Sequence, residues 1–403
     1  MRVLIADTFE QSGRDALESA GFAIDYQPQL GSGDLATAVK NADVLVVRST
    51  EVPAEVFDAA GPLGMVIRAG AGHNTIDSKA AAARGVFVAN VPGKNAVAVA
   101  ELTMGLILAI DRRIPENVYA ARSGTWNKKE FSQSEGLLGK TLGIVGLGQI
   151  GLALAERAVS FGLRVLALER NRSHSTGERM QELGVLVVPD LGTLLDQSHI
   201  VSLHVPGSDE TKHLVDASFL SRMRPGAILI NTSRGDVIDE DALLECINSK
   251  NLRVGLDVFA AEPGSSTGSF ESALVGHPRV YTTHHIGAST AQAQEAIAAE
   301  VVEMIKDYER GIARNVVNLT PPDPQGSLLV VRHFDRVGVL STVLGALREA
   351  GLNVQEMKNE VFSGAGASVA SIHVQGLIPD DVLESVVRNP DVIFATARDL
   401  PST

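Results

Sequence analysis

Three polar segments in the second half of the sequence carry side chains that could transfer a proton and hold an anion. Each follows a strand-like apolar run, and they contain Arg234, Glu262 and His285. A histidine can act as a general base, and the planar guanidinium of an arginine can hold a carboxylate. A neighbouring carboxylate would favour the protonated imidazole and raise its pKa. If the three side chains converge, they suit the oxidation of a hydroxy acid. Taken singly, a salt bridge, a surface acid and a loop histidine would explain them as well.

A glycine-rich segment precedes these residues. Gly146, Gly148 and Gly151 form the pattern Gly-Leu-Gly-Gln-Ile-Gly between the apolar run at residues 142–145 and a helical pattern at residues 150–161. Such glycines permit a tight turn, let a pyrophosphate approach the backbone and let the helix pack on the strand. The segment therefore predicts a dinucleotide site, although a glycine-rich turn without a ligand has the same residues.

The acid that follows the next predicted strand indicates which dinucleotide binds. Glu169 lies 23 residues after Gly146, where a carboxylate accepts hydrogen bonds from ribose hydroxyls and repels a 2′-phosphate. NAD is therefore favoured, while Arg170 and Arg172 keep NADP open. Polar residues after other strands are expected to line the same site, since ligands bind at the carboxyl ends of parallel strands. The further cofactor-binding residues expected are Gln149, Ile150, His204, Pro206, Thr232 and Asp257.

Composition and charge exclude several function classes. The formal net charge of −13 argues against a nucleic-acid surface, which needs clustered Lys and Arg. The longest apolar runs, such as residues 102–110, are too short to cross a bilayer, and the single cysteine, Cys246, fits a reducing cytoplasm. The histidines have no metal-ligand spacing, so no metal is expected.

Apolar runs alternate with helical patterns along the chain, which is the rhythm of parallel sheets covered by helices. The strands expected in the first part lie at residues 3–6, 44–47, 65–69 and 86–89, and, after a helix at 96–110, at 141–145, 164–167, 185–188, 200–203, 227–231, 254–257 and 280–283. A helix at 291–310 follows. Prolines then break the pattern at 320–326, and the remaining residues predict a βαββαβ order, which is ferredoxin-like.

Three motifs resemble the D-isomer-specific 2-hydroxyacid dehydrogenase family. They are residues 68–77 (RAGAGHNTID), 93–102 (GKNAVAVAEL) and 138–146 (LGKTLGIVG), and the resemblance runs from about residue 40 to 318. It implies that Arg234 and His285 are catalytic and that Glu262 pairs with the histidine. His284 stands where the family usually has proline, and register selects His285 as the base.

The resemblance also implies a domain organisation. A flavodoxin-like α/β substrate domain would comprise residues 1–98 and 289–318, and a Rossmann-type doubly wound NAD-binding domain residues 99–288. A linker at 319–326 would lead to a regulatory domain of the ACT type at 327–403.

Within the family, the sequence is most similar to members that oxidise D-3-phosphoglycerate, the first step of serine biosynthesis. In those members the pair matching Arg48 and Ser49 contacts the substrate phosphate, and Ala71 and Gly72 would offer N–H groups to the carboxylate. Lys128 matches a lysine that reaches the active site from a neighbouring subunit. A reductase of glyoxylate, hydroxypyruvate or another keto acid is the alternative, and a non-enzymatic NADH-sensing protein is a third hypothesis.

The C-terminal residues resemble an ACT domain through residues 335–340 and 351–354 (DRVGVL and GLNV). The resemblance implies that His333, Asp335 and Asn353 contact an amino-acid effector, for which serine is the hypothesis. A module that only dimerises is the alternative. A homodimer or homotetramer is expected.

Overall fold

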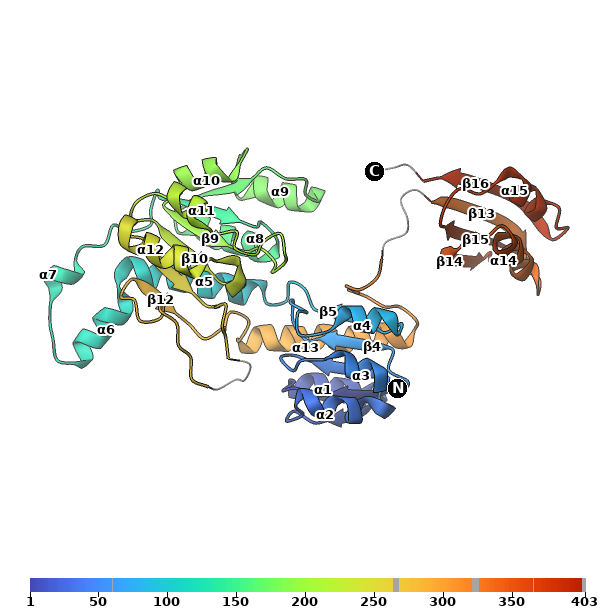
Figure 1. The fold of residues 1–403 in the computed structure, drawn as a ribbon, viewed down its shortest axis with the longest axis horizontal. Helices are drawn as coiled ribbons and strands as arrows, with labels where there is room; N and C mark the ends of the chain where they lie inside the picture. The colour runs from blue at the N-terminus through green and yellow to red at the C-terminus, as the bar shows by residue number, and fades with distance from the viewer. Residues whose placement is uncertain (60, 264–267, 321–325, 365, 401–403) are drawn as a thin grey trace. The chain divides into compact units, whose positions relative to one another are not determined.

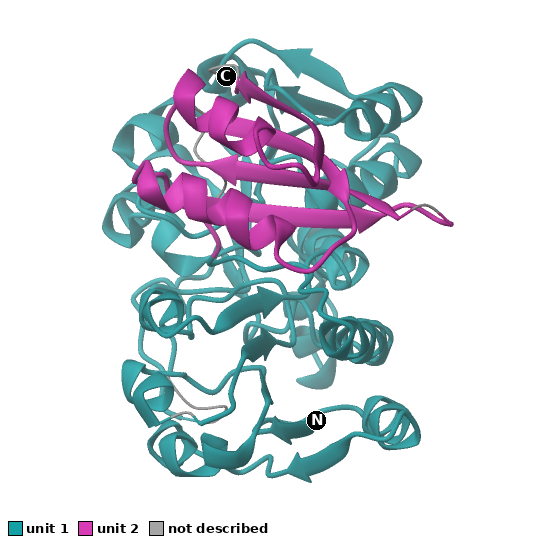
Figure 2. Ribbon diagram, turned by 90° about the vertical axis from the view of Figure 1, so that its right-hand side faces the viewer, with its two compact units in different colours: residues 1–318 teal, residues 319–403 magenta. Residues whose placement is uncertain are grey.

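The computed structural model describes residues 1–59, 61–263, 268–320, 326–364 and 366–400. The chain forms two compact units, Met1–Asn318 and Leu319–Thr403 (Figure 2). The first contains two parallel sheets and the second one antiparallel sheet, so the expected α/β fold class is confirmed. Both domains expected from the resemblance lie within the first unit, and the boundaries between them stay predictions.

The N-terminal sheet of the first unit has the strand order β2-β1-β3-β4-β5. This is a flavodoxin-like order, in agreement with the substrate domain that the resemblance implies. Its strands are β1 (Arg2–Ile5), β2 (Ala23–Tyr26), β3 (Val44–Val47), β4 (Met65–Arg68) and β5 (Phe87–Asn90). One face packs on α1 (Gln11–Ser19) and α13 (Ala291–Glu309) and the other on α2 (Ser32–Ala38), α3 (Ala54–Ala59) and α4 (Ser78–Ala83). Helix α13, near the end of the unit, thus returns to the first sheet (Figure 1).

The second sheet has the order β12-β11-β10-β9-β6-β7-β8. Its strands are β6 (Thr141–Val145), β7 (Arg164–Leu168), β8 (Leu186–Val188), β9 (Ile200–Leu203), β10 (Ile228–Asn231), β11 (Arg253–Leu256) and β12 (Val280–Thr282). Because the chain order reverses between β6 and β9, the carboxyl ends of these two strands form the crevice in which doubly wound folds bind ligands.

Helices cover both faces of this second sheet. One face packs on α5 (Ala96–Arg112), α8 (Gln149–Ser160) and α9 (His174–Glu182). The other face packs on α10 (Leu191–Gln197), α11 (Ala217–Arg222) and α12 (Glu240–Lys250). Two further helices, α6 (Ile114–Arg122) and α7 (Lys128–Phe131), bury none of their residues and project from the body of the unit (Figure 1). No helix in the described parts of the chain is both long and apolar enough to cross a bilayer.

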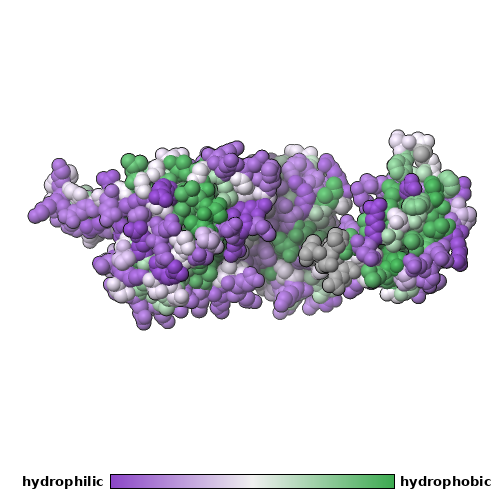
Figure 3. Space-filling view, turned by 90° about the horizontal axis from the view of Figure 1, so that it is seen from above, coloured by the Kyte–Doolittle hydropathy of each residue, from purple (hydrophilic) through white to green (hydrophobic). Residues whose placement is uncertain are grey.

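The second unit has the predicted βαββαβ order. Its strands are β13 (Ser327–Phe334), β14 (Val354–Val361), β15 (Ala367–Val374) and β16 (Val392–Asp399), in the sheet order β14-β15-β13-β16. Helices α14 (Val339–Glu349) and α15 (Asp380–Val387) cover one face of this sheet. Every second side chain of β13 is buried on that face, including Leu329 and Val331. Large apolar side chains of this unit remain at the surface (Figure 3), among them Met357, Val361 and Phe394.

Candidate functional site

Each glycine of the fingerprint has its own structural reason. Gly146 follows β6 with φ +97°, and a Cβ there would overlap the carbonyl of His204 at the end of β9. A Cβ at Gly151 would lie 2.6 Å from the oxygen of Gly146, so this glycine lets α8 pack closely on the turn. A Cβ at Gly148 would meet nothing within 4 Å. The turn is therefore closed on the protein side and open at Gly148, as a bound pyrophosphate requires.

The surroundings of α8 also suit a dinucleotide. The helix begins at Gln149 after a Gly148 cap without a side-chain hydrogen bond, so its first N–H groups can face an anion. Exposed Glu169 follows β7 and makes no ion pair with any described residue. The guanidinium of Arg172 instead donates to the carbonyls of Leu168 and Arg170. The carboxylate is therefore available to ribose hydroxyls.

The other expected cofactor residues fall at the same edge of the sheet. His204 Nε2 forms a hydrogen bond with Ser202 Oγ at 2.9 Å. Burial lowers the pKa of His204 to about 4, so the ring is neutral. Buried Thr232 contacts Thr103 Oγ1 at 3.0 Å. Pro206 follows β9 and accepts from Thr211. Ile150 lies in the first turn of α8.

The carboxylate of Asp257, which was expected to bind the cofactor, is already engaged by hydrogen bonds within the protein. It is buried and accepts from Thr283 Oγ1 (2.6 Å) and from the N–H groups of Ile286 (2.9 Å) and Gly287 (2.8 Å). The N–H of His285 donates to the Asp257 carbonyl. Asp257 therefore fixes the loop that presents His285.

His285 and Glu262 form a pair. The Nδ1 atom of His285 lies 2.7 Å from Glu262 Oε2, while Glu262 Oε1 accepts from the N–H of Phe259 at 2.9 Å. Burial raises the pKa of Glu262, but the bonds from His285 and Phe259 and the charges of His285 and Arg234 outweigh it and hold the pKa below its ordinary value. An ionised Glu262 accepts the Nδ1 proton, which leaves Nε2 as the free nitrogen.

Arg234 reaches from the second sheet toward the loop after β4. A Cβ at Gly72 would overlap its guanidinium, and a Cβ at Gly207 would lie 3.1 Å from its Cγ. Its carbonyl accepts from Asn231 and its Nη1 donates to Ser233 O at 2.6 Å. Arg234 lies near enough to Glu262 for its charge to help lower the pKa of that carboxyl. The structure thus brings Arg234, Glu262 and His285 together.

A further arginine, Arg68, was not expected among the site residues. It ends β4, its Nε donates to the carbonyl of Arg48 at 3.0 Å, and a Cβ at Gly70 would overlap its guanidinium. Burial and the charges of Arg234 and Arg48, only partly offset by Asp7, lower its pKa to about 10. Asp7 Oδ2 is itself occupied by the N–H groups of residues 48–50. Three guanidinium groups therefore share one region, and Asp7 offsets their mutual repulsion only in part.

Comparison with known proteins identifies the family. Residues 104–287 match the model of the NAD-binding domain of D-isomer-specific 2-hydroxyacid dehydrogenases. A D-3-phosphoglycerate dehydrogenase of Methanocaldococcus jannaschii is 37% identical over 368 residues, which are 90% of this chain and 68% of the relative. The chain belongs to the D-isomer-specific 2-hydroxyacid dehydrogenase family. It is therefore a dehydrogenase that uses a nicotinamide dinucleotide, as the fingerprint predicts.

Other members of this family are also similar. A hydroxypyruvate reductase of Thermotoga maritima is 41% identical over 75% of this chain and 97% of its own length. A D-3-phosphoglycerate dehydrogenase of Mycobacterium tuberculosis is 41% identical over 68% of this chain, which spans half of that relative. Among solved structures, a Thermus thermophilus protein has a TM-score of 0.69 and 33% identity, covering 79% of this chain and all of that one.

Within this dehydrogenase, the expected substrate residues lie on different elements. Arg48 and exposed Ser49 follow β3, and no hydrogen bond among the described residues uses the N–H groups of Ala71 or Gly72. Lys128 begins the projecting helix α7, whose Glu130 faces the amino end of β11. The chain therefore does not bring its own Lys128 to the catalytic set.

The three residues expected to bind an effector are not together in one copy of the second unit. His333 is buried and contacts Phe334 O (2.8 Å) and Asn359 Oδ1 (3.1 Å). The N–H of Asp335 donates to the carbonyl of Gly366, just before β15. The carbonyl of Asn353 accepts from the N–H of Gln375, just after β15. The ends of that strand are roughly 25 Å apart. A site that used all three would need a second copy.

Proposed function

We propose that the chain oxidises D-3-phosphoglycerate to 3-phosphohydroxypyruvate, with NAD as the cofactor. The observation that carries the proposal is the convergence of Arg48, Arg68 and Arg234. Partly buried cations whose charges are only partly offset call for an anionic ligand, and this substrate carries both a carboxylate and a phosphate dianion. Burial, followed by the charges of Arg234 and Arg48, lowers the pKa of Arg68 to about 10, and an anion bound beside it would oppose these effects.

Each residue has a distinct role in this proposal. Nε2 of His285 takes the hydroxyl proton, and Glu262 holds the ring and stabilises the imidazolium. Arg234 holds the carboxylate and the developing carbonyl oxygen, since its guanidinium presents a fork of donors. Arg48, with Ser49, and Arg68 hold the phosphate. The nicotinamide, when bound, accepts the hydride.

Reduction of hydroxypyruvate is the second candidate, because the Thermotoga maritima hydroxypyruvate reductase is similar over almost its whole length. Hydroxypyruvate has a carboxylate but no phosphate. It would therefore use Arg234 and leave Arg48 and Arg68 without a ligand.

Arg48→Ala separates the two candidates. The variant should have a kcat/KM for D-3-phosphoglycerate that is at least ten-fold lower. Its kcat/KM for D-glycerate, the hydroxy acid that corresponds to hydroxypyruvate, should be nearly unchanged. Arg84→Ala is the matched control, since Arg84 is an exposed arginine of the same half that pairs with Asp58. If Arg48→Ala lowers both values equally, the phosphate assignment is wrong.

We also infer that the protein is a homodimer or homotetramer in which the projecting helices contact a second copy. Tyr119 and Trp126 on and beside α6 are 76% and 88% exposed, which is unusual for aromatic side chains. Light scattering of the full chain, and of Trp126→Ser, tests the inference. A monomer at micromolar concentration would overturn it.

Serine is the effector proposed for the second unit. Millimolar L-serine should lower turnover or raise the melting temperature of the full chain, and Asn353→Ala should abolish the effect. The proposal fails if serine changes neither quantity.

A further inference from the structure

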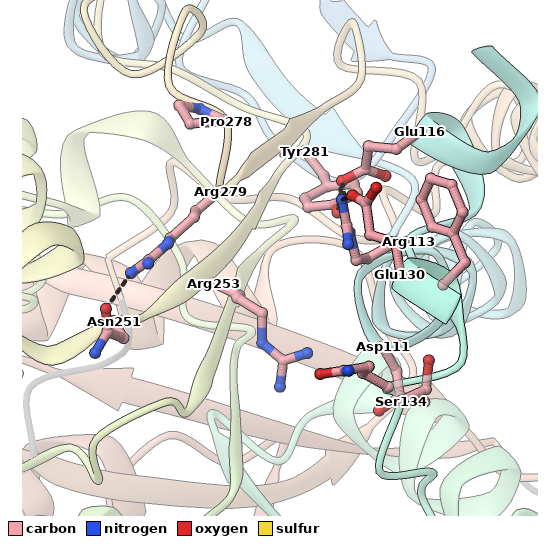
Figure 4. A pocket seen from close by; sticks show the side chains of 12 residues that line it. Asp111, Arg113, Glu116, Glu130, Ser134, Asn251, Arg253, Pro278, Arg279 and Tyr281 are labelled. Atoms are coloured by element: carbon pink, nitrogen blue, oxygen red, sulfur yellow. Dashed lines mark hydrogen bonds and ion pairs between the residues drawn. The ribbon is translucent and has the colours of Figure 1, made fainter. Parts of the chain in front are cut away.

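A cavity of about 450 Å³ lies in the first unit at the amino ends of β11 and β12, away from the catalytic carboxyl ends (Figure 4). Side chains from the end of α5, from α6 and α7 and from the two strands line it. The volume falls in the range of about 300–1,000 Å³ that small-molecule sites occupy. The dinucleotide fingerprint and the catalytic set contribute none of the lining residues.

The cations of this cavity are not equally engaged. Arg113 pairs with Glu130 at 3.0 Å and stacks on Phe131, and Arg279 donates to Asn251 Oδ1 at 2.6 Å. Arg253 has only one long hydrogen bond, of 3.5 Å to a backbone carbonyl, and no ion pair with any described residue. Its side chain extends into the cavity (Figure 4). Arg253 is therefore the cation available to a ligand.

The acidic side chains of the cavity are also unequally engaged: Glu130 pairs with Arg113, whereas Asp111 and Glu116 each have an oxygen without a hydrogen-bond partner in the described chain. Asp111 is only 3% exposed, and its Oδ1 has no hydrogen-bond partner in the described chain. The nearest cation, Lys140 Nζ, is 3.9 Å away and is engaged by Glu135 at 2.7 Å. Glu116 accepts from the Tyr281 hydroxyl through Oε1, while its buried Oε2 has no hydrogen-bond partner there.

The position of Asp111 strengthens its preference for a cation. It lies in the last turn of α5, a 17-residue helix whose C-terminal carbonyls carry partial negative charge. A positive group beside Asp111 would meet both the carboxylate and the helix dipole. Leaving a carboxylate buried without a full set of donors is costly, so this is the place where a ligand contributes most.

We propose that this cavity binds a small zwitterion of the α-amino-acid class. Its carboxylate pairs with Arg253, and its ammonium lies beside the carboxyl groups of Asp111 and Glu116. The three arginines and three acids of the lining carry no net charge, so a simple anion or cation would leave one set of partners repelled. A zwitterion satisfies both sets. This site is independent of the substrate assignment and of the second unit, although α6 and α7, which line it, are also the helices that we propose contact a second copy.

Isothermal titration of the full chain with glycine, L-alanine and L-serine tests the proposal. Propionate and propylamine, which each carry one of the two charges, are the ligand controls. At least one amino acid should bind, and Asp111→Asn and Arg253→Gln should each weaken it ten-fold or more. Arg164→Gln is the matched control, because Arg164 also begins a strand of this sheet but is exposed and outside the cavity.

Asn353→Ala separates this site from the second unit, since it should leave the binding unchanged. Circular dichroism shows whether every variant is folded. Arg253 and Asp111 are also each replaced by a residue of the same charge, in Arg253→Lys and Asp111→Glu. The proposal is overturned if no amino acid binds the wild type, if both single-charge controls bind as tightly, if binding survives Arg253→Gln or Asp111→Asn, or if Asn353→Ala abolishes it.

Discussion

Arg68 ends a strand of the first sheet and is repelled by Arg234, which follows a strand of the second sheet. Each guanidinium lies against a glycine of one loop, at Gly70 and Gly72. Two cations that come from different sheets therefore pack against the same loop. Neither guanidinium forms an ion pair with a described residue, and Asp7 offsets the charge around Arg68 only in part, so the site is prepared for an anion.

Inorganic phosphate should stabilise the fold through these cations. At concentrations well above its Kd, we expect the melting temperature to rise by about 2–5 °C, since a ligand that binds only the native state stabilises it. Scanning fluorimetry in phosphate and in chloride of equal ionic strength measures this. Arg68→Gln should lose most of the shift, and an equal shift in that variant would contradict the assignment.

Gly72→Ala should displace Arg234, because the added Cβ overlaps its guanidinium. We expect kcat/KM to fall ten-fold or more while the protein stays folded, as steady-state kinetics and circular dichroism can show. Gly105→Ala in α5 is the control, since its Cβ meets nothing within 4 Å and alanine favours a helix. Equal activity of the two variants would exclude the close contact at Gly72.

Glu262 links stability to pH. Its pKa is lowered in the folded protein, so its charged form contributes stability above the ordinary pKa of 4.5, and that contribution is lost as the pH falls through the lowered value. Urea unfolding should therefore show Glu262→Gln less stable by about 1 kcal/mol at pH 7, with the difference shrinking below pH 4.5. Exposed Glu309→Gln should show no such trend. A difference that is constant down to pH 3 would contradict the linkage.

Glu169 should set the cofactor preference. Glu169→Ala removes the charge that repels a 2′-phosphate, so the kcat/KM ratio of NADP to NAD should rise about ten-fold, equivalent to about 1.4 kcal/mol. Initial rates with both cofactors measure the ratio. Glu178→Ala, at an exposed position of α9, is the control, and an unchanged ratio in Glu169→Ala would assign the preference elsewhere.

The sequence predicts most elements of this fold because the central strands are apolar runs flanked by turns. Edge strand β2 was missed, since its side chains are half exposed and give no continuous apolar run. Helices α6 and α7 were also missed: they have only nine and four residues, so neither gives a long periodic pattern.

The catalytic set was accessible from the rule that ligands bind at the carboxyl ends of parallel strands. That rule places His285 and Arg234 at one edge, but it applies to one sheet at a time. The approach of Arg68 depends on how two sheets face each other, which no local pattern encodes. The available signal was that Arg68 ends β4 and Arg48 directly follows the adjacent strand β3, with Val47 paired to Arg68 in the sheet.

The most direct test of the account is the ratio of kcat/KM for D-3-phosphoglycerate to that for D-glycerate, measured on the purified full chain with NAD. We predict a ratio of at least about 100, since loss of a phosphate from a paired cationic site costs about 3 kcal/mol or more. A ratio near one, or turnover of D-glycerate alone, would show that the arginine cluster does not select a phosphate.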